Sequence, residues 1–349
     1  MTWDFFLRMK YIPLTLSLLF LLFGCKETKN DGFIIFNQTV SVHCYEFEYE
    51  LIVDIPSQIE LLDSILLFMR PGKHAAKHID IRTGEDKGPV WHLGRGPNEF
   101  IQPYFAGIIS KDSSLVIFDG PLGGLFAKYK WRLSNQRPVF ELITNFNYSG
   151  QYAITSPRVL ENGYTISRII SGANRTLLLH DKEMNVLENF YNPLNVDFKN
   201  DLRPLQGHLA SYQNKFVFAA VNFGYICCYE VSDQGDLKLN WEHWLTDPVY
   251  DTNPSFKFNQ NKNRDGFYDV KIVDDYIFAL YSGEVYDYND PKTPKNILVF
   301  SHEGQPIVHL KLDRELARVA VTPDGKTIFS FDWRNSSKLI KYDLSDVLQ

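Results

Sequence analysis

The chain contains 349 residues, of which 44% are hydrophobic, 15% aromatic and 22% charged. This apolar content is enough for a packed core and excludes a disordered or collagen-like chain. The 36 basic and 42 acidic residues give a formal net charge of −6, which argues against a protein that binds nucleic acid through its phosphates. Phe (26) and Tyr (19) are abundant while Met (4) is scarce, and this balance favours strands over helices.

Residues 1–24 have the parts of a secretory signal peptide. Arg8 and Lys10 provide a positive start, and Ile12–Phe23 form an almost unbroken apolar run. This run is shorter than the roughly 20 residues that a membrane-spanning helix needs. The segment ends in Leu22-Phe23-Gly24-Cys25, which resembles the lipobox of bacterial lipoproteins. The resemblance implies cleavage before Cys25 and lipidation of its thiol. The alternative is an ordinary signal peptide with an incidental cysteine.

Residues 25–32 form a short polar segment that we interpret as a tether behind the lipid. Its acidic residues resemble the surface-export signals of some Gram-negative lipoproteins, although Lys26 and Lys29 interrupt them. We therefore expect an outer-membrane lipoprotein in the envelope of a Gram-negative bacterium. The chain would be held at the membrane by its N-terminal lipid, facing either the periplasm or the cell surface. Each buried methylene of that lipid contributes about 0.8 kcal/mol to the anchoring.

The other three cysteines are Cys44, Cys227 and Cys228. Neighbouring residues of a strand point to opposite faces, so a disulfide between Cys227 and Cys228 would be strained. The spacing matches neither a disulfide framework nor a zinc site. We expect buried free thiols.

Residues 33–349 repeat a pattern of about 50 residues. In each unit a polar turn precedes a strand of aromatic and β-branched residues, and a second apolar strand follows. The turns lie near Leu62, Asp112, Asn162, Gln213, Asp274 and Asp324, at spacings of 50, 50, 51, 61 and 50 residues. The first strands expected are Ser64–Phe68, Leu115–Phe118, Tyr164–Ile169, Phe216–Val221, Tyr276–Leu280 and Thr327–Phe331. The second strands are His78–Ile81, Leu125–Tyr129, Thr176–His180, Tyr225–Tyr229, Ile297–Phe300 and Leu339–Tyr342.

Six such units, each with three or four strands, predict an all-β fold, a six-bladed β-propeller. The long interval has a visible cause, because Glu284–Pro294 reads as an insertion in the fifth blade. The sixth unit stops after its third strand, and the strand-like segments Ile34–Phe36 and Val40–Val53 precede the first unit. We expect one of these N-terminal segments to complete the sixth blade and close the ring. A β-sandwich would show shorter, less regular spacing, and an α/β fold would need amphipathic helices.

Two motifs resemble those of one protein family. Thr322-Pro323-Asp324-Gly325-Lys326 is similar to the Ser-Pro-Asp-Gly-Lys turn of TolB-like propeller repeats. Gly94-Arg95-Gly96-Pro97-Asn98-Glu99-Phe100 is similar to a motif of TolB-like six-bladed propeller lipoproteins from gut Gram-negative bacteria, with Asn98 where Gly is commoner. The resemblance spans the whole mature chain in architecture. It implies a fold and a location, and no reaction.

The segment Gly94–Phe100 carries the first candidate ligand-binding residues: Arg95, Asn98 and Glu99. Its glycines allow close backbone approach, and Arg95 offers a planar set of five donors to a carboxylate or a sugar. The alternative is that Arg95 and Glu99 bond to the backbone and hold adjacent blades together. The segment is not a phosphate-binding loop, because no Gly-Lys-Ser/Thr follows.

The insertion Glu284–Pro294 carries the second candidates, Tyr286 and Tyr288, next to carboxylate and amide side chains. Aromatic rings among such groups are typical of loops that contact carbohydrate or protein. The alternative is a long hairpin whose tyrosines cover the edge of the blade.

No catalytic residue or metal ligand can be selected from the sequence. His74 and His78 are four residues apart, but they flank the start of a strand and lack a third ligand. Sialidase-type boxes and a Gly-x-Ser-x-Gly motif are absent. We expect a binding module for a glycan, a peptide or an envelope protein, without a cofactor. The alternative is a calcium-dependent hydrolase or lactonase that acts in the propeller channel. A sensor domain within a larger assembly is a third interpretation.

Overall fold

A computed structural model describes residues 34–50, 56–70, 72–96, 99–120, 124–134, 137–170, 176–196, 203, 206–253, 255–285, 293–332 and 338–348. The chain divides into a first unit, residues 1–35, and a second unit, residues 36–349, which contains all the strands that are described. The described residues also form two short 3₁₀ helices, η1 (Ser110–Asp112) and η3 (Gln260–Lys262). None of the helices in this part of the chain is long and apolar enough to span a membrane.

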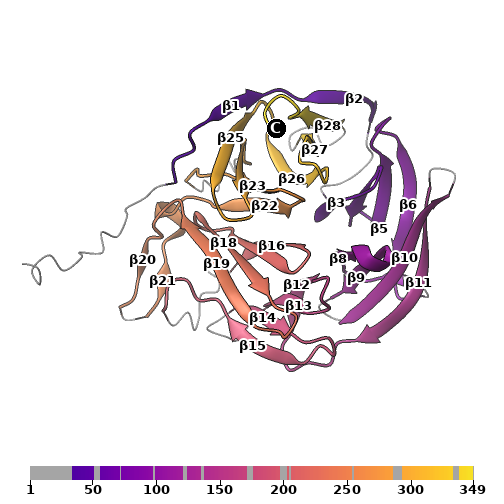
Figure 1. The fold of residues 1–349 in the computed structure, drawn as a ribbon, viewed down its shortest axis with the longest axis horizontal. Helices are drawn as coiled ribbons and strands as arrows, with labels where there is room; N and C mark the ends of the chain where they lie inside the picture. Colours follow the sequence, from indigo (N-terminus) through magenta and orange to yellow (C-terminus); the bar gives the residue numbers. More distant parts are fainter. Residues whose placement is uncertain are drawn as a thin grey trace, which may run out of the picture. The chain divides into compact units, whose positions relative to one another are not determined.

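Six mainly antiparallel sheets in a ring form the blades of a β-propeller (Figure 1), which confirms the predicted fold class. Blade one contains β3 (Gln58–Leu62), β4 (Ile65–Met69), β5 (His74–Asp80), β6 (Asp86–Leu93) and β7 (Glu99–Phe100). Blade two contains β8 (Pro103–Ile109), β9 (Ser114–Asp119), β10 (Leu125–Ser134) and β11 (Arg137–Asn147). Blade three contains β12 (Ile154–Val159), β13 (Thr165–Ile169), β14 (Leu177–His180) and β15 (Val186–Phe190).

The other three blades follow the same strand order. Blade four contains β16 (Gly207–Tyr212), β17 (Lys215–Ala220), β18 (Tyr225–Val231) and β19 (Leu237–Trp244). A small hairpin of β20 (Tyr250–Asp251) and β21 (Lys257–Phe258) comes before blade five. Blade five contains β22 (Phe267–Ile272), β23 (Tyr276–Tyr281), β24 (Asn296–Ser301) and β25 (Pro306–Leu312). Blade six contains β26 (Leu316–Val321), β27 (Thr327–Asp332) and β28 (Lys338–Asp343).

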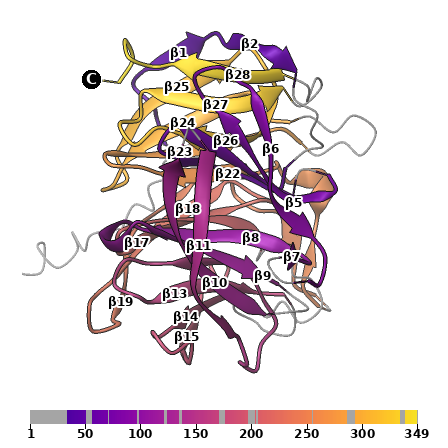
Figure 2. The same cartoon turned by 90° about the vertical axis from the view of Figure 1, so that its right-hand side faces the viewer.

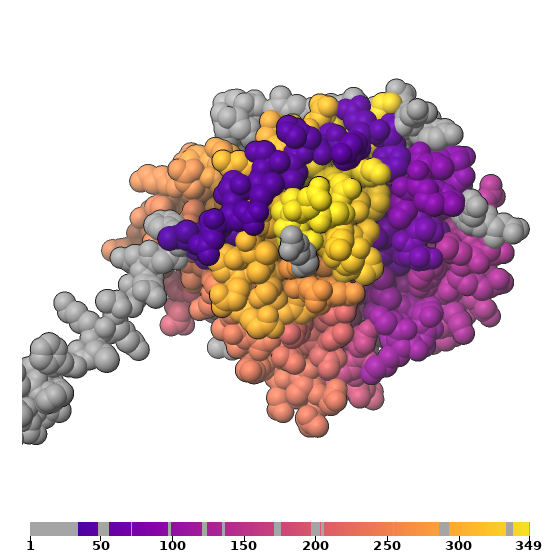
Figure 3. Space-filling model, turned by 45° about the horizontal axis from the view of Figure 1, so that its top comes forward, coloured from indigo at the N-terminus to yellow at the C-terminus, as the bar shows by residue number. Residues whose placement is uncertain are grey.

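Two N-terminal strands complete the ring. β2 (Tyr45–Glu50) pairs antiparallel with β28 and becomes the fourth strand of blade six, as predicted. β1 (Thr39–Val42) pairs parallel with β25 and adds a fifth strand to blade five, which the sequence analysis does not predict. Figures 2 and 3 show this N-terminal segment lying along the strands of the last two blades. The N-terminal segment therefore covers the outer edges of two blades at once.

The repeat found in the sequence corresponds to the middle of each blade. The predicted first strands are the second strands of the blades, and the predicted second strands are the third strands. β4, β9 and β14 are buried along their whole length, because both faces of a blade pack against neighbouring blades. The outermost strands are more exposed, and β11 is exposed over most of its length.

Hydrophobic clusters fill the spaces between adjacent blades. One cluster joins blades three and four through Phe190, Phe216 and Phe218, and another joins blades one and two through Trp91 and Tyr129. Each described cluster combines strands from two neighbouring blades. The blades are therefore held together mainly by apolar packing, and the central channel carries the polar contacts.

The predicted turn at Thr322–Lys326 joins β26 and β27. Gly325 has φ of +72°, a conformation that favours glycine, and its N–H bonds to the Thr322 carbonyl at 2.8 Å. The Asp324 carboxylate accepts hydrogen bonds from the Thr322 hydroxyl and the Lys326 N–H. This side chain holds the turn in place, as expected for Asp in a tight turn.

Candidate functional site: an arginine-lined cavity

The innermost strands of the six blades surround a central channel. β3, β8, β12, β16, β22 and β26 contact one another in ring order. Residues near the starts of these strands line a cavity of about 380 Å³, and residues near their ends line a second cavity of about 280 Å³. The two cavities therefore lie towards opposite ends of the channel.

The first cavity is rich in arginine. Arg70 of blade one, Arg158 and Arg168 of blade three, and Arg318 of blade six all line it, and we call it the arginine cavity. Asp269 is the one carboxylate among its lining residues. The rest of its wall comprises Ser57, Gln58, Tyr104, Ser156, Gln206, Gly207, His208, Leu209 and Val221.

Irregular strand pairing accompanies these arginines. The register shifts between Thr155 and Arg158 in β12, and a second shift occurs next to Arg318 in β26. A β-bulge turns side chains away from the regular alternation, and here both arginines become part of the cavity wall. Ser156 and Arg70 have φ of +48° and +53°, which is uncommon for residues with a side chain. Left-handed backbone of this kind is often found at functional sites.

Backbone carbonyls of neighbouring blades hold two of the guanidinium groups. Arg158 donates from Nη1 to the Phe105 carbonyl of blade two at 2.5 Å, and Arg168 donates from Nη1 to the Gly207 carbonyl of blade four at 2.8 Å. Nε of Arg168 is buried and has no hydrogen-bond partner among the described residues. A buried donor without a partner costs about 1–3 kcal/mol. A bound acceptor in the cavity would recover part of that cost.

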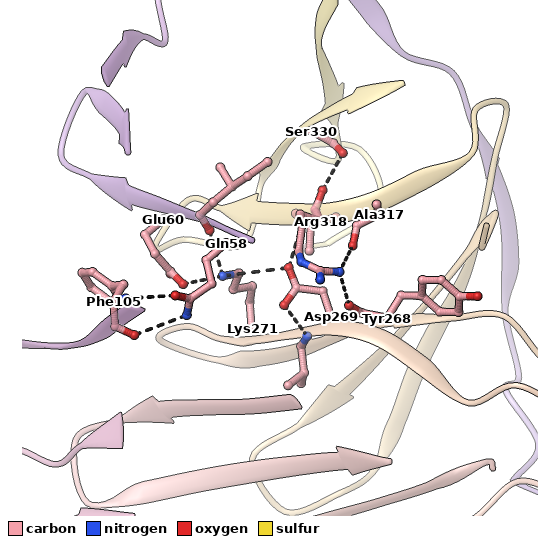
Figure 4. Close-up of polar contacts among 12 residues, drawn as sticks. Gln58, Glu60, Phe105, Tyr268, Asp269, Lys271, Ala317, Arg318 and Ser330 are labelled. Atoms are coloured by element: carbon pink, nitrogen blue, oxygen red, sulfur yellow. Dashed lines mark hydrogen bonds and ion pairs between the residues drawn. The ribbon is translucent and has the colours of Figure 1, made fainter. Parts of the chain in front are cut away.

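Arg318 joins three blades (Figure 4). It donates from Nε to the Ser57 carbonyl of blade one at 2.7 Å and from Nη1 to the Tyr268 carbonyl of blade five at 2.8 Å. A further bond from Nη1 reaches the carbonyl of Ala317, its neighbour in blade six. Arg318 therefore fixes the junction at which the first and last blades meet.

The single carboxylate in the wall of the arginine cavity already accepts hydrogen bonds from backbone N–H groups. Asp269 accepts from its neighbour Val270 N–H at 2.9 Å and from Val319 N–H of blade six at 3.0 Å (Figure 4). Its nearest cation is Lys271, whose Nζ lies 4.0 Å away. Among the described residues, none of the four cavity arginines forms an ion pair. Their positive charge is therefore not neutralised by a paired carboxylate in this part of the chain.

Burial shifts the pKa values of three residues in the cavity wall, and nearby positive charge adds to the shift of one of them. Burial lowers the pKa of Arg168 to about 10 and also lowers the pKa of Arg158. The pKa of His208 lies well below its ordinary value, first because of burial and then because of four nearby cations. Those cations are Arg318, Arg168, Arg158 and Lys271. His208 is therefore neutral at pH 7, and the cavity is electropositive.

The second cavity has a different character. Its wall contains four carboxylates, together with Arg158 and Lys271: Glu60, Asp63, Glu161 and Asp274. Asp274 accepts a hydrogen bond from the Tyr212 hydroxyl at 3.0 Å. Within the described residues, no group of three His, Cys, Asp or Glu side chains is arranged to hold a metal ion. The channel thus has a cationic cavity at one end and carboxylates at the other.

The structure gives the Gly94–Phe100 motif a defined local geometry. Glu99 accepts from the Gly96 N–H at 2.7 Å through Oε2, and Phe100 is buried against Trp91. A Cβ added at Gly94 would lie 2.0 Å from Glu99 Oε2, so this glycine leaves room for the carboxylate. Arg95 is exposed, and neither Arg95 nor Glu99 lines either cavity. The role of these residues in ligand binding remains a prediction.

Several other predicted features lie outside the described residues: the signal peptide 1–24, the tether 25–32, Cys25, Asn98, Tyr286 and Tyr288. Cys44, Cys227 and Cys228 are free thiols, the last two fully buried and Cys44 half-buried. His74 and His78 lie on strand β5, and His78 Nδ1 is 3.2 Å from the Gly88 carbonyl.

The sequence analysis missed the arginine cavity, although a signal was present. Arg168 and Arg318 each stand in a short apolar strand, in Thr165–Ile169 and Leu316–Val321. A charged residue inside a buried strand needs a polar environment, which a propeller offers in its channel. The residues are up to 248 positions apart (Arg70 to Arg318), so only the ring closure brings them together.

Comparisons with known proteins bear on the fold. No protein-family model matches the chain, and no curated protein matches it. Among solved structures, it is similar to a member of the DUF4221 family from Bacteroides vulgatus, at 12% identity and a TM-score of 0.52, over 89% of this chain and 94% of the other. It is also similar to the Cps50 (Swd1) β-propeller domain of Myceliophteria thermophila, at 9% identity and a TM-score of 0.48, over 86% and 100% of the two chains. At these identities the similarity concerns the fold alone.

Proposed function

We propose that the protein is a ligand-binding module held at the cell envelope of a Gram-negative bacterium by a lipid on Cys25. The observation that supports binding is the arginine cavity, a polar space of about 380 Å³ with four arginines and a single carboxylate in its wall. Ligand pockets in proteins commonly have about 300–1,000 Å³. The ligand is a glycan, a peptide or part of an envelope protein that presents a polar group to this cavity.

The anchoring part of the proposal rests on the sequence Leu22-Phe23-Gly24-Cys25 and the signal-like residues before it. Its test is expression of the full chain in a Gram-negative host, followed by membrane fractionation and mass spectrometry of the N-terminal peptide. We expect a membrane-bound product that begins at a lipidated Cys25. The Cys25→Ser variant should lack the lipid and leave the membrane fraction. A wild-type product without lipid would contradict the anchoring.

The binding part is tested by thermal unfolding of the protein in the presence of neutral and acidic glycans, peptides, calcium and a chelator. A ligand at 100 times its Kd adds about 2.7 kcal/mol to the free energy of unfolding, which gives a measurable rise in Tm. A rise with a glycan or peptide, independent of the chelator, supports the binding module. A rise with calcium that the chelator reverses supports the alternative, a calcium-dependent hydrolase or lactonase. If every ligand leaves Tm unchanged and affinity capture from an envelope extract finds no partner, the proposal fails.

A further inference from the structure

We propose that the arginine cavity binds the carboxylate of an acidic sugar residue, such as a uronic acid. The inference rests on the proposed function and names the class of ligand that the channel accepts. Three observations support it: arginine donors that lack a full set of partners, the excess of positive charge in the cavity, and the polar character of the other wall residues.

The first argument is the set of donors that the structure leaves open. Arg168 uses Nη1 for the Gly207 carbonyl, while its Nε is buried and has no hydrogen-bond partner among the described residues. Arg158 likewise uses Nη1 for the carbonyls of Phe105 and Pro157. A planar guanidinium edge matches the two oxygens of a carboxylate, and a group already held by carbonyls loses little entropy on binding. The cavity therefore presents oriented donors for an oxyanion.

The second argument is the charge balance. Four arginines face this space, while Asp269 is bonded to two backbone N–H groups and forms no ion pair with any of them in the described part of the chain. An oxyanion would supply the missing negative charge. Asp269 reduces this excess of positive charge but does not remove it. The planar carboxylate is the oxyanion that we propose, because its two oxygens lie in one plane, as the donors of a guanidinium edge do.

The third argument is the polarity of the wall. Of the 14 residues that line the cavity, only Leu209 and Val221 are aliphatic. Ligand pockets are usually mostly apolar, so this one suits a ligand covered with hydroxyl groups rather than an apolar peptide side chain. Ser57, Ser156 and Gln206 provide hydroxyl and amide groups, and Tyr104 adds an aromatic ring. Together with the carboxylate, these features point to an acidic sugar.

The experiment compares glucuronate with glucose, which differ only in the carboxylate, and with glucose 6-phosphate. Binding to the full-length protein in detergent is measured by calorimetry. We expect saturable binding of glucuronate, or of an oligosaccharide that ends in it, at least tenfold tighter than that of either comparison sugar. Arg168→Lys keeps the charge but loses the planar edge, and should weaken binding at least tenfold. Arg70→Gln is a second cavity variant with the same expected effect, and its side chain has no described bond to the backbone. Arg132→Ala, which removes an exposed arginine of β10 that lines neither cavity, is the matched control and should bind normally.

A second readout is the titration of His208 by NMR, assigned with the His208→Gln variant. A carboxylate beside Arg168 and Arg158 offsets their charge, so bound glucuronate should raise the pKa of His208, whose neighbours also include Arg318, Lys271 and Asp269. Glucose should leave it unchanged.

Four results would overturn the inference. One is equal binding of glucose and glucuronate, and another is tighter binding of glucose 6-phosphate. The third is binding of glucuronate that is retained in full in folded Arg168→Lys and Arg70→Gln. No binding of any acidic sugar would also refute it. In each of these cases a glycan or peptide found in the broader screen would leave the proposed function standing.

Discussion

Lys271 of blade five bonds to Glu60 of blade one, across the inner strand of blade six that lies between them. The Lys271 Nζ donates to Glu60 Oε1 and to the Ile59 carbonyl, each at 2.8 Å (Figure 4). The side chains of the pair are only 11% and 14% exposed. This contact therefore ties two blades that are not neighbours in the ring, and both side chains belong to the wall of the second cavity.

Replacing Lys271 should destabilise the propeller. Lys271→Met leaves the Glu60 carboxylate and the Ile59 carbonyl without their partner in a mostly buried place, which we expect to cost about 3 kcal/mol. Urea denaturation of the purified protein gives the change in the free energy of unfolding. The control is Lys128→Met, which breaks the more exposed ion pair with Asp112 and should cost less than about 1 kcal/mol. Equal losses of stability in the two variants would show that the Lys271–Glu60 contact stabilises the protein no more than an exposed ion pair does.

The N-terminal strands should be required for a closed and monomeric ring. A chain that starts at residue 56 lacks β1 and β2, and so exposes the edges of β25 and β28. Open edges pair with other chains, so we expect a lower Tm and self-association. A chain that starts at residue 34 retains both strands and serves as the control. Size-exclusion chromatography with light scattering, together with thermal unfolding, compares the two. An unchanged monomer with the same Tm in the shorter chain would contradict the closure.

Stability should fall in mild acid because of His180. Its Nε2 lies 2.7 Å from the Ser167 hydroxyl in a fully buried site, and burial lowers its pKa to about 4. The unfolded chain takes up this proton near the ordinary value of about 6.5, whereas the folded chain does so only near 4. The contribution of His180 is therefore complete above pH 6.5 and decreases as the pH falls from 6.5 towards 4.

The measurement is the free energy of unfolding at pH 7 and pH 5. The loss between these values should be about 2 kcal/mol smaller in His180→Phe than in the wild-type protein, since the variant cannot take up this proton. The exposed His43 is the matched control, and His43→Phe should behave as the wild type does. An identical pH dependence in the wild type and in His180→Phe would show that His180 does not cause the loss of stability in mild acid.

The Gly94–Phe100 motif offers a test of its two interpretations. Glu99→Ala removes the acceptor for the Gly96 N–H and should lower stability by about 1 kcal/mol or less. Glu99→Gln keeps an acceptor oxygen and should lose less. Arg95→Ala should change stability by less than about 0.5 kcal/mol, as is usual at exposed positions. Thermal unfolding compares the three variants. A clear loss of stability in Arg95→Ala would instead support its role in holding adjacent blades together.

The middle strands of every blade could be found from the sequence because they are defined locally. Leu115–Phe118, Phe216–Val221 and Tyr276–Leu280 are continuous apolar runs that follow polar turns, and a run of this kind forms a buried strand wherever it is placed. Most of the innermost and outermost strands mix polar with apolar residues, so their bounds were not predicted. The fifth strand of blade five was missed because β1 pairs in parallel with a strand about 270 residues away, and a short segment carries no sign of its partner.

The sequence by itself thus determined the number of blades, the middle strands and the use of an N-terminal strand to complete the last blade. These features depend on periodic apolar runs and on turns such as Thr322–Lys326, which are determined by residues close together in the chain. Only the tertiary structure decided where the charges of the channel meet. Arg70, the pair Arg158 and Arg168, and Arg318 come from three distant parts of the chain, and bulges at Arg158 and next to Arg318 make these two side chains part of one cavity wall. The direction of an inward side chain depends on register and ring closure, which no local pattern of residues specifies.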